Sequence, residues 1–241
     1  MFRKKNIIPD YSRLGTDLHS HLLPGIDDGA PDINTSLQLI IGLSDLGYKK
    51  LITTPHIMLD RYPNTREGIL EKLEELNSEI QKQKLNVEVL AAAEYFLDDH
   101  FANLLEKKEP LLCISENKVL VEFSFAQPPL ALKEILFEMQ LQGYVPVIAH
   151  PERYIYLERN KNFCDELKAS GFLFQVNMLS LGSYYGREVH DFAQNLIRRG
   201  YYDLIGTDLH HVNHLEALRD GNLTSSFNKL LDSGKIINDQ L

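Results

Sequence analysis

Seven mainly apolar runs, rich in residues that favour β-structure, are spaced along the chain. Most are continuously apolar and do not alternate with polar residues, which is typical of parallel strands covered on both faces. We therefore predict seven strands, over residues 13–21, 49–56, 87–96, 118–125, 145–154, 173–180 and 202–211.

Amphipathic segments separate these runs. Apolar residues recur in them at the spacing of one helix face, as at Ile69, Leu73, Leu76 and Ile80, and Asp32 is expected to cap the first helix. Four segments end in a glycine followed by an aromatic residue, which favours a left-handed helix cap. These glycines are Gly47, Gly143, Gly171 and Gly200. The pattern predicts helices over residues 32–47, 64–83, 129–143, 160–171 and 187–200.

The strands and helices alternate in a regular order. Strand starts recur about every 30 residues, which is the length of a βα unit. Such a series without a linker rich in proline, glycine or serine predicts an α/β fold in one barrel-like domain over residues 1–241. An open, doubly wound sheet is the alternative, although the chain has no GxGxxG motif of the dinucleotide-binding type.

Composition excludes several classes of protein. The formal net charge of −9 disfavours a nucleic-acid-binding protein that uses a broad basic face. Neither Cys113 nor Cys164 lies in a glycine- and arginine-rich anion loop, which disfavours a cysteine-dependent phosphatase. The basic segment 1–10 lacks the apolar core of a signal peptide, and no apolar stretch is long enough to span a membrane. We expect a cytoplasmic protein without stable membrane insertion.

Ionisable or polar residues follow the apolar part of each predicted strand. In a parallel βα barrel all strands point the same way, so these residues meet at the face where barrel active sites are built. In chain order they are His19 and His21, His56, Glu94, Glu122, His150 with Glu152 and Arg153, Asn177 as a weaker candidate, and Asp208 with His210 and His211.

Taken singly, each of these residues has a simpler explanation. A lone buried histidine is usually hydrogen-bonded in a core, and Asp27–Asp28–Gly29 has the composition of a turn. Together, however, several carboxylates with one nearby arginine leave a surplus of negative charge, and buried charges are costly unless paired or bound to metal. His19 and His21 are two positions apart, so on a strand both point to one side. We predict a metal site, with Asp28 supplied by the following loop.

Six motifs together resemble a known family: DLHSHLLPGIDDG, TTPH, AAAEY, VEFSF, VIAHPERY and GTDLHH. They are similar to those of the PHP (polymerase and histidinol phosphatase) metallophosphatases, and most similar to the manganese-dependent protein-tyrosine phosphatases of bacterial capsular and exopolysaccharide operons. The resemblance implies a distorted (β/α)7 TIM-like barrel and three divalent metal ions, Mn or alternatively Fe or Zn, that activate water for attack on phosphate. It implies a phosphotyrosine protein as substrate, in particular a bacterial tyrosine kinase of polysaccharide export.

The resemblance also implies roles for individual residues. Carried over to this chain, one metal is bound by His19, His21, Glu94 and Asp208, a second by Glu94, Glu122 and His150, and the third by Asp28, His56 and His210. Arg153 matches an arginine that holds the substrate phosphate. A second arginine that relatives can carry after the last motif is missing here, and His211 or Arg61 is the candidate to replace it. Asp208, His210 or His211 is the candidate proton donor.

Three other functions remain open at this stage. A small-molecule phosphatase, such as histidinol-phosphate phosphatase, would share the metal ligands. An amidohydrolase-like barrel also begins with an HxH motif, but it commonly uses a bridging lysine on its fourth strand, where this chain has Glu122. A non-catalytic metal-binding module would be expected to have lost ligands, and none of the matched ligands is missing here.

Overall fold

A curled parallel sheet forms the centre of the protein in a computed structural model, which describes residues 7–241. Residues 1–6, part of the segment inspected for a signal peptide, lie outside the described residues. All strand pairings recorded are parallel. The strands are β1 Thr16–Asp17, β2 Lys50–Thr53, β3 His56–Ile57, β4 Glu88–Ala91, β5 Glu94–Phe96, β6 Lys118–Glu122, β7 Val145–Ala149, β8 Leu173–Asn177 and β9 Leu204–Gly206.

The strands form two connected arcs. One arc has the order β1-β2-β4 and the other the order β3-β5-β6-β7-β8-β9. The predicted strand over 49–56 is split into β2 and β3 at Pro55, which has no N–H to donate, and the predicted strand over 87–96 is split into β4 and β5. A parallel bridge between Ser20 and Leu209 links the chain beyond β1 to the chain beyond β9.

Both faces of the curled sheet are buried, as the continuous apolar runs predicted. Ile52 and Leu120 belong to a cluster inside the curl, together with residues of β7 and β9. Their neighbours Leu51 and Val121 belong to a larger cluster that includes the helices around the outside. Because successive residues of a strand point to opposite faces, apolar neighbours are required where both faces are covered.

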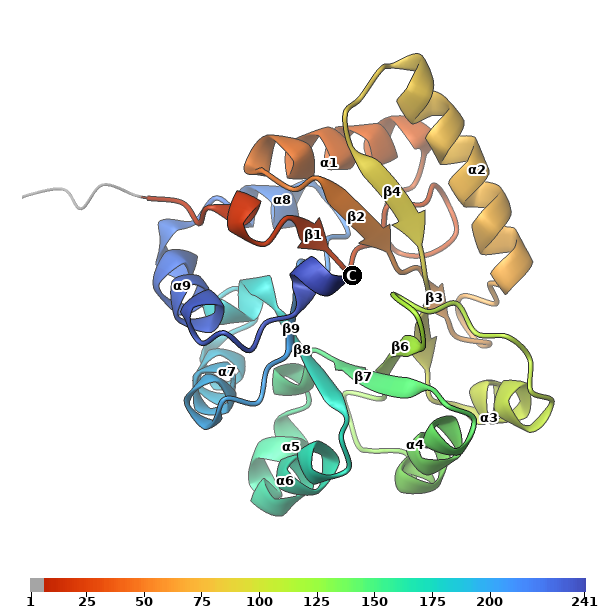
Figure 1. Ribbon diagram of the computed structural model, residues 1–241, viewed down its shortest axis with the longest axis vertical. Helices are drawn as coiled ribbons and strands as arrows, with labels where there is room; N and C mark the ends of the chain where they lie inside the picture. Colours follow the sequence, from red (N-terminus) through yellow and green to blue (C-terminus); the bar gives the residue numbers. More distant parts are fainter. Residues whose placement is uncertain (1–6) are drawn as a thin grey trace, which may run out of the picture.

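Helices surround the sheet (Figure 1). Asp32 caps the first through its side chain, and Gly47 and Gly200 end two helices with φ values of 114° and 65°, so these predicted caps are confirmed. No helix within residues 7–241 is long and apolar enough to cross a bilayer. The helices are α1 Ile33–Leu46, α2 Arg66–Lys82, α3 Asp99–Glu106, α4 Leu132–Leu141, α5 Ile155–Arg159, α6 Lys161–Ala169, α7 Arg187–Arg199, α8 Val212–Ala217 and α9 Thr224–Asp232.

Some predicted boundaries were wrong. The helix α3 was not predicted; it begins at Asp99, and the side chain of the N-cap residue Asp98 accepts a hydrogen bond from Phe101 N. The strands predicted over 145–154 and 173–180 end at Ala149 and Asn177, where short 3-10 helices replace them. A proline at the start of the first 3-10 helix explains one of these early ends, because proline cannot continue the ladder of the strand.

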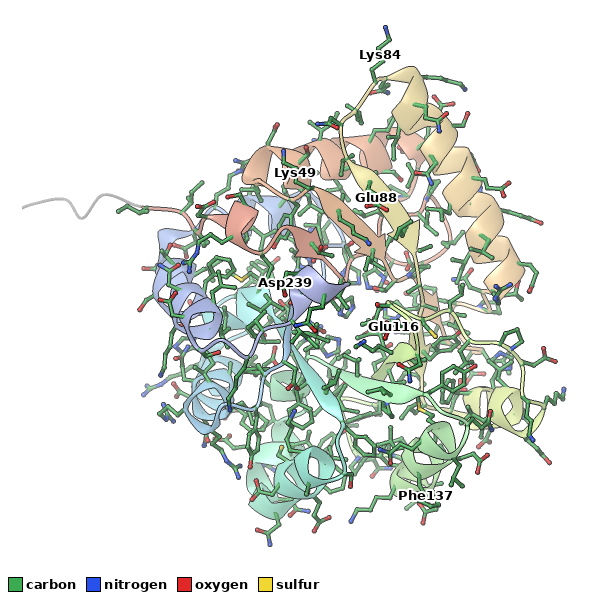
Figure 2. The ribbon with its side chains drawn as sticks, in the orientation of Figure 1. Lys49, Lys84, Glu88, Glu116, Phe137 and Asp239 are labelled. Carbon is green, nitrogen blue, oxygen red and sulfur yellow. The ribbon has the colours of Figure 1, made fainter. Side chains whose placement is uncertain are left out.

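The carboxyl-terminal segment closes the end of the sheet where the strands begin. The buried Asn238 side chain donates to Thr16 O and Ile205 O and accepts from Ile205 N, and the terminus lies near the middle of the ring in Figure 1. Figure 2 shows exposed charged side chains near the strand starts, Lys49, Glu88, Glu116 and Asp239. The buried ionisable residues lie at the opposite end.

Candidate metal centre

The carboxyl ends of the strands carry a cluster of buried histidines and acids. Most of them, together with neighbouring loops, line a cavity of about 290 Å³. His19 and His21 lie just beyond β1, His56 begins β3, Glu94 begins β5, Glu122 ends β6, His150 follows β7, and Asp208 and His210 follow β9. His150 and Asp208 have positive φ values of 34° and 51°, so the backbone leaves each strand in a conformation that residues other than glycine rarely adopt.

The two histidines of the HxH motif point to the same side, as expected. Their Nε2 atoms lie 3.4 Å apart, and they flank Ser20, which forms the bridge to Leu209. His19 can occupy this position only because residue 206 is a glycine: a Cβ on Gly206 would lie 2.6 Å from the Cβ of His19.

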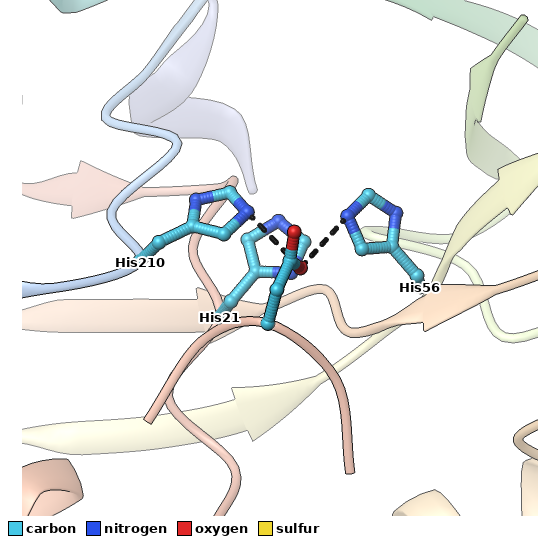
Figure 3. A group of neighbouring side chains, drawn as sticks. His21, His56 and His210 are labelled. Atoms are coloured by element: carbon cyan, nitrogen blue, oxygen red, sulfur yellow. Dashed lines mark ion pairs between the residues drawn. The ribbon is translucent and has the colours of Figure 1, made fainter. Parts of the chain in front are cut away.

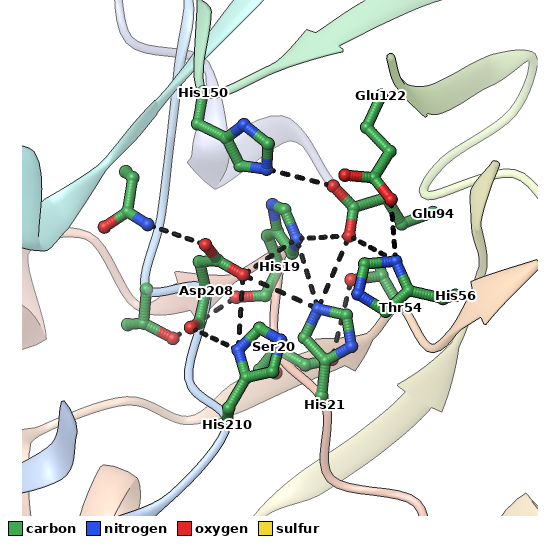
Figure 4. A network of polar contacts seen from close by, with 12 residues as sticks. His19, Ser20, His21, Thr54, His56, Glu94, Glu122, His150, Asp208 and His210 are labelled. Carbon is green, nitrogen blue, oxygen red and sulfur yellow. Dashed lines mark hydrogen bonds and ion pairs between the residues drawn. The ribbon is translucent and has the colours of Figure 1, made fainter. Parts of the chain in front are cut away.

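Glu94 lies at the centre of the cluster (Figure 4). Its Oε2 atom is 3.1 Å from His19 Nε2, 3.5 Å from His21 Nε2 and 3.3 Å from His56 Nδ1. Its Oε1 atom is 3.1 Å from His150 Nε2. One fully buried carboxylate therefore contacts four imidazoles that come from three different parts of the chain.

The loop after His21 folds back over the cluster. It brings Asp28 Oδ1 to 3.4 Å from His56 Nε2 and 3.5 Å from His210 Nε2, with His21 behind them (Figure 3). Gly29 permits this approach, because a Cβ there would lie 2.2 Å from the carbonyl oxygen of His21. The acid in the predicted turn thus reaches the cluster, as the sequence suggested.

All nine residues predicted as metal ligands come together. Within each of four groups, one ligand atom per residue lies within 4.8 Å of the others: His21, Asp28, His56 and His210; His19, His21 and Glu94; His19, His150 and Asp208; and His56, Glu94 and Glu122. The groups differ from the predicted assignment, since His150 groups with His19 and Asp208 and His21 also joins the group of Asp28. Glu122 groups with His56, whose Nδ1 atom is 2.9 Å from Glu122 Oε1, and not with His150.

Arg153 lies beside the cluster and borders the cavity. Its Nη1 atom donates to Asp208 Oδ2 at 2.8 Å, and the side chain of Asn177 donates to the same oxygen at 2.7 Å. The rings of Phe125 and Tyr185 flank the guanidinium, with their centroids 4.7 Å and 4.5 Å from Cζ. Neither ring was singled out from the sequence, because an aromatic residue near a strand end carries no distinctive signal.

The two residues expected to replace the second phosphate-binding arginine lie in different places. His211 lines the cavity, and its ring packs against that of His214 with centroids 3.9 Å apart and planes tilted by 41°. Arg61 is exposed and is not among the residues that line the cavity. The structure therefore brings His211, but not Arg61, to the site.

Comparison with known proteins identifies the family. The family model for capsular polysaccharide synthesis, CpsB/CapC, matches residues 15–228. The chain belongs to the CpsB/CapC family. It is 30% identical over 197 residues to the tyrosine-protein phosphatase YwqE of Bacillus subtilis strain 168, covering 81% of this chain and 77% of the relative. It is 27% identical over 230 residues to the putative tyrosine-protein phosphatase CapC of Staphylococcus aureus, covering 92% and 90%.

A solved structure agrees with this assignment to the CpsB/CapC family. It comes from the crystal structures of YwqE from Bacillus subtilis and CpsB from Streptococcus pneumoniae, which are described as unique metal-dependent tyrosine phosphatases. The TM-score is 0.80 at 26% sequence identity, over 93% of this chain and 90% of the other. The resemblance to the phosphatases of polysaccharide operons is confirmed.

The donor set of this CpsB/CapC protein fits divalent metal ions. Imidazole nitrogens and carboxylate oxygens suit manganese, iron and zinc. Burial by itself lowers the pKa of the His56 imidazole, but nearby acids, Glu94 above all, raise it to about 10. The pKa values of His19 and His21 are raised for the same reason. The carboxylates therefore stabilise positive charge within the cluster. Bound metal ions would supply such charge as well.

Neighbouring positive charges lower the pKa values of two central acids, Asp208 and Glu94. Burial raises the pKa of the Asp208 carboxyl, but His19, His210 and Arg153 outweigh this effect and hold the pKa well below its usual range. The pKa of Glu94 is lowered in the same way. Asp208 is therefore poorly suited to donate a proton, which leaves His210 and His211 as the better candidates.

Hydrogen bonds behind the cluster orient its histidines. His21 Nδ1 lies 2.8 Å from Asp27 Oδ2, and His19 Nδ1 lies 2.9 Å from Gln175 Oε1. Each oxygen accepts from a protonated Nδ1, which leaves the Nε2 lone pair directed into the cluster. The sequence assigned Asp27 to a turn and did not single out Gln175, although a polar glutamine within an apolar strand is a signal in its favour.

Replacing Asp27 with alanine is expected to weaken metal binding about 10- to 100-fold, because His21 loses the acceptor that fixes its tautomer. Affinity for Mn²⁺, measured by titration calorimetry, checks this. Asp60→Ala is the matched control, since Asp60 is exposed. Equal affinity in wild type and the Asp27 variant would show that the hydrogen bond does not orient His21 for a metal.

Proposed function

We propose that this protein is a metal-dependent protein-tyrosine phosphatase of capsular or exopolysaccharide synthesis. The observation that carries the proposal is the convergence of five imidazoles and four acids in one cluster, at a cavity beside Arg153, in a chain of the CpsB/CapC family. The substrate is a phosphotyrosine protein, in particular the tyrosine kinase of polysaccharide export. The cytoplasmic location expected from the sequence remains a prediction.

Three divalent metal ions, with manganese favoured over iron or zinc, form part of the proposal. The residues that would hold them are His19, His21, Asp28, His56, Glu94, Glu122, His150, Asp208 and His210. When bound, such ions polarise the phosphate and lower the pKa of water so that it becomes a nucleophile near neutral pH.

The charge of the cavity supports the need for cations. Four carboxylates and one guanidinium line it, so ionised carboxylates would leave a net charge of −3 when the histidines are neutral. A phosphate dianion would be repelled from such a cavity, because like charges at short range disfavour binding. Metal ions would reverse the sign of the cavity and make it attract phosphomonoesters.

Arg153 and the histidines beyond β9 complete the proposed chemistry. The free N–H groups of Arg153 would bind phosphate oxygens while Asp208 and the flanking rings hold the guanidinium in place. A phenol leaves with a pKa near 10, so a tyrosine ester needs less help from a proton donor than an alkyl ester does. Because His210 is proposed to hold a metal, His211 would supply that proton.

The fold is proposed to be a distorted (β/α)7 barrel that forms one domain over residues 1–241. Two observations support a seven-stranded count. β2 with β3, and β4 with β5, are consecutive halves of two predicted strands, and the bridge between Ser20 and Leu209 joins the first strand to the last.

The test of function is hydrolysis of a phosphotyrosyl peptide by purified protein supplied with Mn²⁺, Fe²⁺, Co²⁺ or Zn²⁺. We expect turnover with at least one metal and higher kcat/KM on this peptide than on histidinol phosphate. A higher kcat/KM on histidinol phosphate than on the peptide would identify a small-molecule phosphatase. Hydrolysis of lactones or amides would indicate an amidohydrolase, and no turnover on any substrate a non-catalytic module.

A further inference from the structure

Phe125 borders the cavity with an unusually exposed ring. It lies three residues beyond the end of β6, and 49% of its surface is exposed. One part of the ring packs against Tyr154 and His150, at centroid distances of 5.4 and 5.8 Å. The remaining surface is apolar and lies next to a cavity whose other walls are mainly charged or imidazole groups. Orientation of metal ligands does not require such a surface.

Phe125 also limits how Arg153 can bind a ligand. Phe125 and Tyr185 flank the guanidinium, and Asp208 accepts a hydrogen bond from Nη1. A guanidinium flanked by rings binds through its N–H edge, which is the geometry that suits a phosphate. If the substrate phosphate binds at this edge, the group esterified to it would therefore lie within reach of the flanking rings.

We propose that Phe125 contacts the aromatic ring of the substrate and so favours aryl over alkyl phosphomonoesters. The inference rests on the proposed function, because it places the substrate phosphate at Arg153. Contacts between aromatic rings typically strengthen binding about two- to tenfold beyond the burial of apolar area. Phe125 is a specificity residue and takes no part in breaking the P–O bond.

The experiment compares two ligands that carry the same phosphonate group. Benzylphosphonate has a ring one carbon from phosphorus, as phosphotyrosine has a ring one oxygen away, and methylphosphonate has none. Binding of each to manganese-loaded protein is measured by titration calorimetry. Wild type is expected to bind benzylphosphonate about fivefold more tightly. Phe125→Leu should lose most of this preference, because it weakens binding of benzylphosphonate more than binding of methylphosphonate, and Phe125→Tyr should keep it.

Two outcomes would overturn the inference. If Phe125→Leu weakens both ligands equally, Phe125 acts only by holding Arg153. If the variant retains the preference for benzylphosphonate, Phe125 does not contact the ring. Phe137→Leu is the matched control, since Phe137 is also an exposed phenylalanine and lies on α4 at the periphery (Figure 2). The measurement does not depend on turnover, so failure of the proposed phosphatase activity would appear separately, in the peptide assay.

Discussion

Replacing Glu94 with glutamine is expected to lower kcat for phosphotyrosyl peptide hydrolysis about 10³-fold, which corresponds to about 4 kcal/mol. The expectation follows from the position of the side chain, whose two oxygens contact four imidazoles and which is fully buried. A neutral amide would leave these imidazoles without their shared anion and would remove a ligand from more than one proposed metal. The loss should therefore exceed that from any residue behind the cluster.

Glu88→Gln is the matched control, because Glu88 begins β4 in the same predicted strand and is exposed at the opposite end of the sheet (Figure 2). Its kcat is expected to equal that of wild type. Circular dichroism and metal content are measured on both variants, so that unfolding is distinguished from loss of metal. A folded Glu94 variant with wild-type kcat would exclude Glu94 as a shared ligand.

The sequence was most informative where two-sided burial controls the residue types. Leu120 and Val121 face opposite sides of the sheet and are both buried, so the run around them is continuously apolar and marks β6 clearly. Polar residues that interrupt such a run, such as His19 and Glu94, stand out for the same reason. Because parallel strands end at one edge, their meeting could be predicted without knowing any distance.

Other features depend on contacts that no local pattern specifies. The acceptor for His19 Nδ1 comes from Gln175, far away in the chain, and the ring over Arg153 comes from Phe125, in the segment that follows β6. Neither residue has a type or spacing that indicates its partner. The grouping of Glu122 with His56 was also missed, because a resemblance assigns ligands to a site but does not give the distances between them.

The stabilisation of the protein by Mn²⁺ is expected to grow with pH. The pKa of His56 in the metal-free fold is about 10, above its ordinary value of 6.5, because the Glu94, Asp28 and Glu122 carboxylates face its ring. Protonated His56 therefore stabilises the metal-free fold fully below about pH 6.5, and this contribution is lost as the pH rises through about 10. Metal binding requires the neutral imidazole, so it strengthens about tenfold per pH unit for each proton displaced.

Both trends increase, with rising pH, the difference in stability between metal-loaded and metal-free protein. Glu94 and Asp208, whose pKa values are lowered, are ionised in both folded and unfolded chains above about pH 5, so they add no slope at higher pH. At a fixed Mn²⁺ concentration, the rise in Tm on adding metal should be small at pH 6 and larger by about 5 °C or more at pH 8.

Thermal unfolding with and without Mn²⁺ at the two pH values measures this difference. His56→Gln is expected to reduce the pH dependence, because one displaced proton and one ligand are removed. His100→Gln is the matched control, since His100 lies in α3 outside the four candidate ligand groups and should leave the dependence unchanged. A rise in Tm that is equal at pH 6 and pH 8, or larger at pH 6, would mean that metal binding displaces no protons, and His56 could not then be a ligand.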